Sequence, residues 1–187
     1  MSEKNFANYD PTPTRRALCN YRVRLACDED LQGLVRIAHE REGPTDVGVG
    51  ALTAGMSRRL DFSAEKGRLF VAEGEDGGLL GYGASAYMNF PRDGTLPEPV
   101  HDCWYLTGVV VTPSARRASI GRALTVARID AWSSCGGPLR FVANANNRPS
   151  IVLHEELGFE LEAREFNMPG VEFTSSKGLL YRLDPVT

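Results

Sequence analysis

Residues 109–124, VVVTPSARRASIGRAL, bring together residue types that can bind a phosphate group. A β-branched stretch ends at Pro113, two arginines follow, and an amphipathic helix is predicted to begin at Ser119-Ile120-Gly121. The N–H groups in the first turn of a helix point at a bound anion, with the positive end of the helix dipole behind them. Arginine adds bidentate contacts to phosphate. The stretch therefore predicts a site for a phosphate-bearing cofactor.

A surface connection with solvated arginines is the alternative interpretation, because short glycine patterns often occur without a ligand. The stretch lacks the paired glycines and the downstream acid of a dinucleotide-binding motif. It also lacks the Gly-Lys-Ser/Thr of a nucleotide P-loop. A cofactor bound here would be held by a different kind of turn.

A second segment decides between the two interpretations. After the strand-like residues 139–143 comes NNRPSIVLHEELGF, residues 146–159. Together, the two segments resemble the GNAT superfamily of acetyl-CoA-dependent N-acetyltransferases, in which a turn R/Q-x-x-G-x-G/A is followed by an Asn, a small residue, a Tyr and then Gly-Phe. The resemblance covers roughly residues 21–183.

The resemblance implies a set of residues that bind acetyl-CoA. The backbone of the central strand would pair with pantetheine, the turn would grip the pyrophosphate, and the second segment would line the far side of the cofactor. The implied residues are Val109, Val110, Val111, Arg116, Arg117, Ala118, Ser119, Gly121, Arg122, Asn147 and Ser150. A backbone N–H near Val109 or Val110 would polarise the thioester carbonyl.

Two positions depart from the family pattern. Ser119 stands where the first glycine of the turn is usual, which is tolerable in helical backbone but weakens binding if the position needs a positive φ. His154 stands where the family often has the tyrosine that protonates the departing thiolate. Histidine can donate that proton. The alternative is a partly buried histidine that packs the helix against the cofactor or the core.

The resemblance implies direct attack of an amine on the thioester in a ternary complex, so a group must accept a proton. The predicted catalytic residues are His154 as the acid, with Glu42 and Tyr105 as candidates for the base. Further candidates are Glu40, Asp93, Glu98 and Asp102. Each of these carboxylates is also consistent with an ordinary solvated loop residue.

The acceptor is predicted to be a small, cationic molecule with a primary amine. The two loops that wall the acceptor site in the family carry more acids than bases here, which favours a polyamine, an amino sugar or an amino-acid-like antibiotic. The acids are Glu40, Glu42, Asp46, Asp93, Glu98 and Asp102, and the bases are Arg41 and Arg92. The segments YLTGVVV and LHEELGF are weakly similar to aminoglycoside 6′-N-acetyltransferases. A protein N-terminal or lysine acetyltransferase and a non-catalytic acetyl-CoA sensor are the alternatives.

Composition narrows the class of protein. The net charge of −3 over 187 residues gives no electrostatic basis for nucleic-acid binding. The absence of a long apolar run and of a signal peptide predicts no membrane segment and a cytoplasmic location. Four cysteines and three histidines without ligand spacing predict free thiols and no metal. Homodimerisation is left open.

The element pattern predicts an α/β (α+β) protein of the GNAT fold, a mixed twisted central sheet of about seven strands with helices on both faces. Residues 1–19 are predicted to be a polar, disordered tail, and residues 20–187 a single acetyltransferase domain. The predicted order is βααβββαβαββ. Its strands are near 21–25, 69–73, 79–87, 104–111, 139–143, 160–166 and 178–183, and its helices begin at a cap at Asp28 and near residues 52, 120 and 149.

Overall fold

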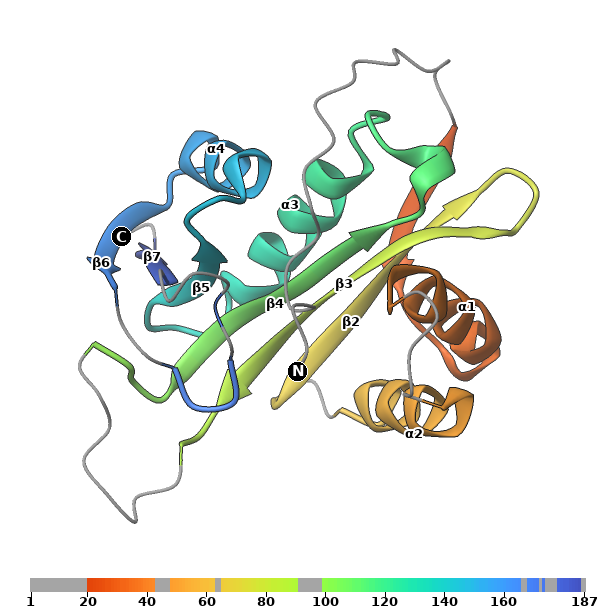
Figure 1. The fold of residues 1–187 in the computed structure, drawn as a ribbon, viewed down its shortest axis with the longest axis horizontal. Coiled ribbons are helices and arrows are strands. Elements are labelled where there is room, and N and C mark those ends of the chain that lie inside the picture. The colour runs from red at the N-terminus through yellow and green to blue at the C-terminus, as the bar shows by residue number, and fades with distance from the viewer. Residues whose placement is uncertain are drawn as a thin grey trace. The chain divides into compact units, whose positions relative to one another are not determined.

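The structure is a computed structural model that describes residues 20–42, 48–62, 65–90, 99–165, 168–171, 173 and 178–185. Its strands are β1 (Tyr21–Leu25), β2 (Gly67–Gly74), β3 (Leu79–Met88), β4 (Cys103–Val111), β5 (Leu139–Asn144), β6 (Glu160–Arg164) and β7 (Gly178–Leu183). Its α-helices are α1 (Leu31–Glu42), α2 (Val49–Leu60), α3 (Ile120–Trp132) and α4 (Arg148–Glu156), and Asp28–Asp30 and Pro113–Ala115 form 3₁₀ turns. The predicted order βααβββαβαββ is confirmed (Figure 1).

The seven strands form a mixed sheet with the hydrogen-bonded order β1-β2-β3-β4-β5-β7-β6. The β4–β5 pair is parallel, whereas β1–β2, β2–β3, β5–β7 and β6–β7 are antiparallel. The predicted mixed sheet is therefore confirmed. In the described residues, none of the helices has the length and apolar character that crossing a membrane requires.

The chain divides into two compact units. The first unit contains the described residues of 20–86 and 107–131, and the second contains those of 87–106 and 132–185. Strand β4 passes from the second unit into the first after Leu106. The predicted tail, residues 1–19, lies outside the described residues, and the single domain over 20–187 stays a prediction.

Within the first unit, alternation along β2 places successive side chains on opposite faces. Leu69 and Val71 pack with the apolar residues of α1 and α2, whereas Phe70 and Ala72 pack with those of α3. Helices α1 and α2 thus lie on one side of β2 and β3, and α3 lies on the other (Figure 1). The prediction of helices on both faces of the sheet is confirmed in this unit.

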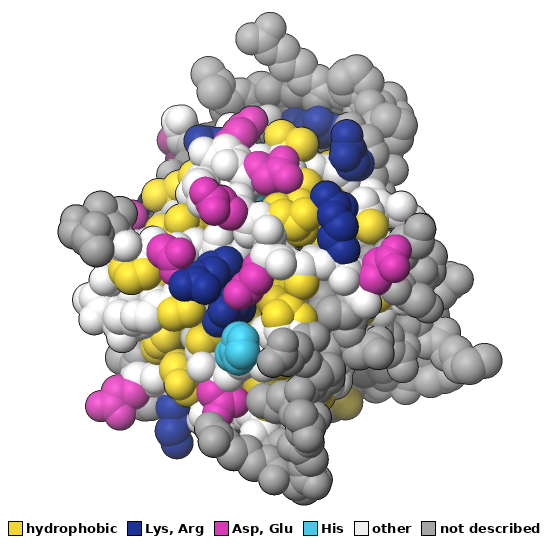
Figure 2. Space-filling model, turned by 90° about the vertical axis from the view of Figure 1, so that its left-hand side faces the viewer, with side chains coloured by type: hydrophobic (Ala, Val, Ile, Leu, Met, Phe, Trp, Pro, Cys, Tyr) yellow, Lys and Arg dark blue, Asp and Glu magenta, His cyan; other side chains and the backbone are white. Residues whose placement is uncertain are grey.

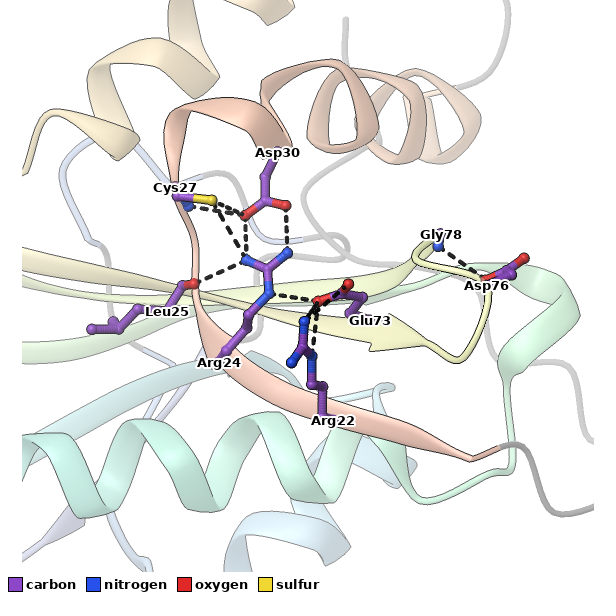
Figure 3. A network of polar contacts seen from close by, with 8 residues as sticks. All are labelled: Arg22, Arg24, Leu25, Cys27, Asp30, Glu73, Asp76 and Gly78. Atoms are coloured by element: carbon purple, nitrogen blue, oxygen red, sulfur yellow. Dashed lines mark hydrogen bonds and ion pairs between the residues drawn. The ribbon is translucent and has the colours of Figure 1, made fainter.

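A network of polar contacts joins β1, β2 and the turn before α1 (Figure 3). Arg24 makes a bidentate contact with the buried Asp30, at 2.6 and 2.8 Å, and its Nε donates to Glu73 at 2.6 Å. The predicted cap at Asp28 is wrong, because Asp28 lies inside the 3₁₀ turn that precedes α1. Asp30 accepts the Cys27 N–H at 2.9 Å instead. The Asp30 carboxylate therefore caps this turn and also joins it to β1 through Arg24.

The second unit has an apolar cluster and an aromatic stack. Phe90, Cys103, Tyr105 and Leu180 belong to the apolar cluster. The ring of Phe141 on β5 is stacked on Tyr181 of β7, with centroids 5.0 Å apart. It is also stacked on the imidazole of His154 in α4. Strands β5 and β7 are therefore held together by ring packing as well as by their ladder.

Candidate functional site

The turn from β4 into α3 is shaped by a proline and by two residues with positive φ. Pro113 begins the 3₁₀ turn, and Arg117 and Ser119 then have φ values of 67° and 61°. The first intrahelical bond follows at once, because Ala123 N–H donates to the Ser119 carbonyl at 3.0 Å. Left-handed residues in a short turn direct successive N–H groups toward one concavity, which is a geometry that binds anions.

Ser119 occupies a backbone conformation that glycine adopts most easily. The sequence left two outcomes open for this position, and the structure has the one with positive φ. A non-glycine residue in this region costs about 1 kcal/mol. The side chain of Ser119 is exposed, so the strain is confined to the backbone. The turn therefore forms with serine in place, and the sequence-based expectation of weaker cofactor binding than with glycine applies.

Positive charge surrounds this turn. Arg116, Arg117 and Arg122 are exposed, and α3 has no acidic residue in its first turn. Arg116 Nε donates to the Val111 carbonyl at 3.5 Å, so this arginine lies against the end of β4. Arginine side chains and the N-terminus of a helix of 13 residues thus lie together in the first unit, as the sequence predicts.

The implied pantetheine strand leads directly into the turn. Val110 packs on the α1 side of the sheet, and Val109 and Val111 pack on the α3 side. The parallel ladder between β4 and β5 comprises the pairs from Trp104↔Leu139 to Leu106↔Phe141. The residues Val109, Val110 and Val111 therefore lie beyond the part of β4 that belongs to this ladder.

A buried arginine lies beneath this strand. Arg128 on α3 is 1% exposed, and its Nη1 donates to the carbonyls of Ala84, at 3.1 Å, and Thr107, at 2.8 Å. Its Nε donates to the Leu124 carbonyl at 3.1 Å and its Nη2 to Thr125 Oγ1 at 2.9 Å. Burial lowers the pKa of Arg128 to about 9, so the guanidinium keeps its charge at neutral pH.

In the second unit, α4 brings Asn147, Ser150 and His154 together. Asn147 is the N-cap of α4, and its Oδ1 accepts the Ser150 N–H at 3.4 Å. His154 is 5% exposed, its Nδ1 lies 2.7 Å from the Ser150 carbonyl, and its ring is stacked on Phe141 with centroids 3.7 Å apart. Phe159 packs edge-on against the same imidazole. The helix therefore uses His154 as a core residue.

Tyr105 is also buried. It is 1% exposed, it lies edge-on to Phe90, and its hydroxyl donates to the His101 carbonyl at 3.1 Å. Burial raises the pKa of Tyr105. The neutral phenol is therefore the favoured form, which is unsuited to accepting a proton at neutral pH.

Two of the remaining carboxylate candidates, Glu40 and Asp102, lie in described parts of the structure. Glu40 forms an ion pair with Arg36 at 3.7 Å, one helical turn earlier. Asp102 Oδ1 accepts the Phe90 N–H at 3.0 Å. The side chain of Glu42 and the whole of Asp93 and Glu98 lie outside the described residues. Glu40 and Asp102 thus have structural partners in the structure.

A half-buried ion pair joins β5 and β6 in the second unit. Arg140 on β5 is bidentate to Glu162 on β6 at 2.7 and 2.8 Å, and its Nη1 lies 3.2 Å from Cys103 Sγ. The contact with Arg140 lowers the pKa of Glu162, whereas burial raises the pKa of Cys103. Basic and acidic side chains also lie next to one another on the face in Figure 2. Within the described ranges, no group of three metal-binding side chains occurs.

Sequence reasoning missed Arg128, although a pattern pointed to it. Ile120, Leu124 and Arg128 are spaced by four residues, so a charged residue lies on the apolar stripe of the helix. A charge at such a position is rarely buried without partners. Gly83 on β3 was missed as well, and an added Cβ there would lie 3.2 Å from Arg128 Nε.

Comparisons with known proteins assign the sequence to a family. The family model described as the acetyltransferase (GNAT) family matches residues 36–159. No curated protein matches the sequence. The predicted similarity to aminoglycoside 6′-N-acetyltransferases is therefore not confirmed.

Solved structures share the fold at low sequence identity. A GNAT-superfamily phosphinothricin acetyltransferase from Sinorhizobium meliloti, in complex with acetyl-CoA, is 18% identical over 87% of each chain, with a TM-score of 0.63. The yncA protein of Salmonella typhimurium, with its cofactor acetyl-CoA, is 19% identical over 90% of this chain and 95% of its own, with a TM-score of 0.65. A GCN5-related N-acetyltransferase from Kribbella flavida is 20% identical over 88% and 97%, with a TM-score of 0.65.

At these sequence identities the solved structures establish only the fold. The family model establishes the family, because it matches the amino-acid sequence directly. Its match covers more than half of the chain and includes the strand, the turn and the helix that carry the candidate site. The chain belongs to the GNAT acetyltransferase family.

Proposed function

We propose that the protein transfers an acetyl group from acetyl-CoA to the primary amine of a small molecule. The observation that carries the proposal is the turn of residues 116–122, in which Arg117 and Ser119 already have the left-handed conformation of an anion-binding turn. Two of the similar structures contain acetyl-CoA, which supports this cofactor as the donor.

The pyrophosphate of acetyl-CoA is assigned to this turn. Arg116 and Arg117 supply charge, and the N–H groups at the start of α3 supply donors. An added Cβ at Gly121 would lie 3.9 Å from the nearest heavy atom, Val109 Cγ1. Packing within the protein therefore does not require glycine at position 121. Close approach of a phosphate to the backbone is a reason for glycine there.

The reaction needs a donor for the oxyanion and an acceptor for one proton. The neutral amine attacks the thioester carbon, the C–S bond breaks, and the electron pair leaves with the sulfur as a thiolate. A backbone N–H near Val109 or Val110 is assigned to the carbonyl oxygen, a type of contact that contributes about 3 kcal/mol. Holding the amine and the thioester in line contributes much of the remainder.

His154 is assigned to packing rather than to proton donation. Its burial, its stacking on Phe141 and its short Nδ1 contact with the Ser150 carbonyl support the packing alternative. Tyr105 is a poor base because its hydroxyl is buried and bonded to a carbonyl. Glu42 is retained as the candidate base, and its role stays a prediction.

The charge of the acceptor also stays a prediction. Glu40, one of the acids that favoured a cationic acceptor, is paired with Arg36. The side chains of Glu42, Asp46, Asp93 and Glu98 lie outside the described residues. The amine panel below therefore contains polyamines, amino sugars, anionic and neutral amino acids, and peptides with a free N-terminus or a lysine.

The proposal is tested by calorimetry with acetyl-CoA and desulfo-CoA, followed by release of free thiol across this panel. Arg116→Ala should weaken cofactor binding by about 1.5–3 kcal/mol, or roughly 10- to 150-fold, because it removes a charge-assisted contact. Arg58→Ala, at an exposed position on α2, is the matched control and should bind as the wild type does.

Thiol release with one class of amine supports the enzyme and identifies its acceptor. Release with peptides alone would replace the small-molecule acceptor by a protein. Tight binding without release for any amine would favour the acetyl-CoA sensor. Absence of binding would overturn the assignment of the turn.

A further inference from the structure

Arg128 is a buried cation whose hydrogen-bond partners are neutral. Among the described residues its partners are three backbone carbonyls and one hydroxyl, and none of the ion pairs there includes it. Taking a guanidinium out of water without a counter-charge is costly. Stability alone is therefore a poor explanation for an arginine at this position.

The partners of Arg128 form a continuous chain of hydrogen bonds. Thr125 Oγ1 donates to the Gly121 carbonyl at 2.8 Å and accepts from Arg128 Nη2 at 2.9 Å. Arg128 Nη1 then donates to the Thr107 carbonyl at 2.8 Å and to the Ala84 carbonyl at 3.1 Å. The chain runs from the first turn of α3 to β4, within the first unit.

Two residues, Thr125 and Gly83, restrict the space around this guanidinium. Thr125 is completely buried, so its hydroxyl has a fixed environment. At Gly83, an added Cβ would lie 3.2 Å from Arg128 Nε and 3.3 Å from Arg128 Cζ. Any other residue at Gly83 would therefore press on the guanidinium. A glycine inside a strand is typical of such a close approach.

We propose that Arg128 and Thr125 are positioning residues that couple the phosphate-binding turn to the segment of β4 that holds the thioester. This inference rests on the proposed function. At one end this chain of hydrogen bonds fixes Gly121, within the turn assigned to the pyrophosphate. At the other end it fixes Thr107, two residues before Val109.

The positive charge of Arg128 has an electrostatic effect on β4 in addition to the positioning effect. The Thr107 carbonyl and the Gly108 N–H belong to one peptide group, so a cation bonded to the carbonyl polarises the N–H and makes it a stronger donor. The backbone that precedes the assigned oxyanion donor is thus both fixed in place and polarised.

The test compares four variants with the wild type. Thr125→Val keeps the shape of the side chain and removes the hydroxyl, and Arg128→Met removes the charge and the donors. Arg128→Lys keeps the charge but reaches fewer acceptors. Arg58→Met is the matched control on the exposed surface of α2. We measure kcat, the KM for acetyl-CoA, Tm, and hydrogen exchange of the amides of residues 108–111.

Positioning predicts that kcat falls about tenfold or more in Thr125→Val and Arg128→Met, because small displacements at a reacting centre cost up to about 100-fold. The KM for acetyl-CoA should change less than kcat. Arg128→Lys should recover part of the rate, and Arg58→Met should retain all of it. Exchange at residues 108–111 should accelerate in Thr125→Val and Arg128→Met at temperatures well below Tm.

A lower Tm with unchanged kcat and unchanged exchange in Thr125→Val and Arg128→Met would overturn the inference. If Arg128→Met does not fold, Thr125→Val decides by the same criteria, since it preserves the packing. If the wild type transfers acetyl to no amine, the proposed function fails. Hydrogen exchange and the affinity for desulfo-CoA then still report whether the chain couples the turn to β4.

Discussion

Two arginines of the first unit differ in how their charge is matched. Arg24 lies at the edge of the sheet, 29% exposed, and is bonded to two carboxylates. Arg128 lies on α3 against β3 and β4, 1% exposed, and is bonded to carbonyls and a hydroxyl. The paired carboxylates around Arg24 are those of a residue that stabilises the fold. The neutral partners of Arg128 indicate a role other than stability.

The pKa values show the same contrast. Hydrogen bonds to Asp30 and Glu73 raise the pKa of Arg24, and burial lowers that of Arg128. Matched charges stabilise each other's ionised forms, and an unmatched buried charge is destabilised. The comparison predicts that substitution of Arg24 acts mainly on stability and that substitution of Arg128 acts mainly on turnover.

Arg24→Met should give the largest loss of stability, about 2–3 kcal/mol. It leaves the buried Asp30 carboxylate without its bidentate partner and releases the turn before α1 from β1. Urea denaturation followed by circular dichroism measures the change. Unchanged stability would mean that the network contributes nothing beyond its packing.

Acid should remove most of this difference between the wild type and Arg24→Met. The hydrogen bond from Arg24 lowers the pKa of Asp30, so its contribution is present above the unfolded pKa of about 4. The contribution is lost as the pH falls through the folded pKa of Asp30. Urea midpoints between pH 6 and pH 2.5 should converge for the two proteins. A constant gap would show that Asp30 is not the relevant partner.

Arg128→Met should change stability by only about 1 kcal/mol. It leaves the Thr107 carbonyl without this donor, which destabilises the fold. It also removes the cost of burying a charge, and the two effects oppose each other. The same urea experiment measures the result. A loss as large as that of Arg24→Met would make Arg128 a structural residue and remove the contrast.

Arg22→Ala should give the smallest effect, a Tm shift of about 1 °C or less. Arg22 contacts the same Glu73 at 3.1 Å, but its side chain is 71% exposed, so water screens the pair. Differential scanning calorimetry measures the shift. A larger shift would mean that solvent exposure does not explain why Arg22 contributes less to stability than Arg24.

Local patterns predicted the elements well where each element has its own periodicity or boundary residue. Strands β1 and β7 begin and end as expected, and the hairpin of β2 and β3 turns at Gly77, whose φ is 79°. The start of α2 was missed by three residues, because Gly48 rather than a polar side chain occupies the N-cap. The predicted last residues of β6 exceed the observed strand, which ends at Arg164.

The candidate site was predicted unevenly for a physical reason. The residues of the turn, from Arg116 to Arg122, are contiguous in sequence, and their backbone geometry depends on local dihedrals. Those proposed for proton transfer are far apart in sequence, and their usefulness depends on burial. His154 and Tyr105 have suitable chemistry, but both are buried against aromatic rings.

By itself, the sequence determined the order of the elements, the mixed α/β class, and the position of the turn that is proposed to bind phosphate, because these depend on periodicity and on neighbouring residues. The conformation of Ser119, the burial of His154 and the partners of Arg128 depended on the tertiary structure. Arg128 and Thr107 are 21 residues apart in sequence, and only the packing of α3 on the sheet brings a guanidinium to that carbonyl.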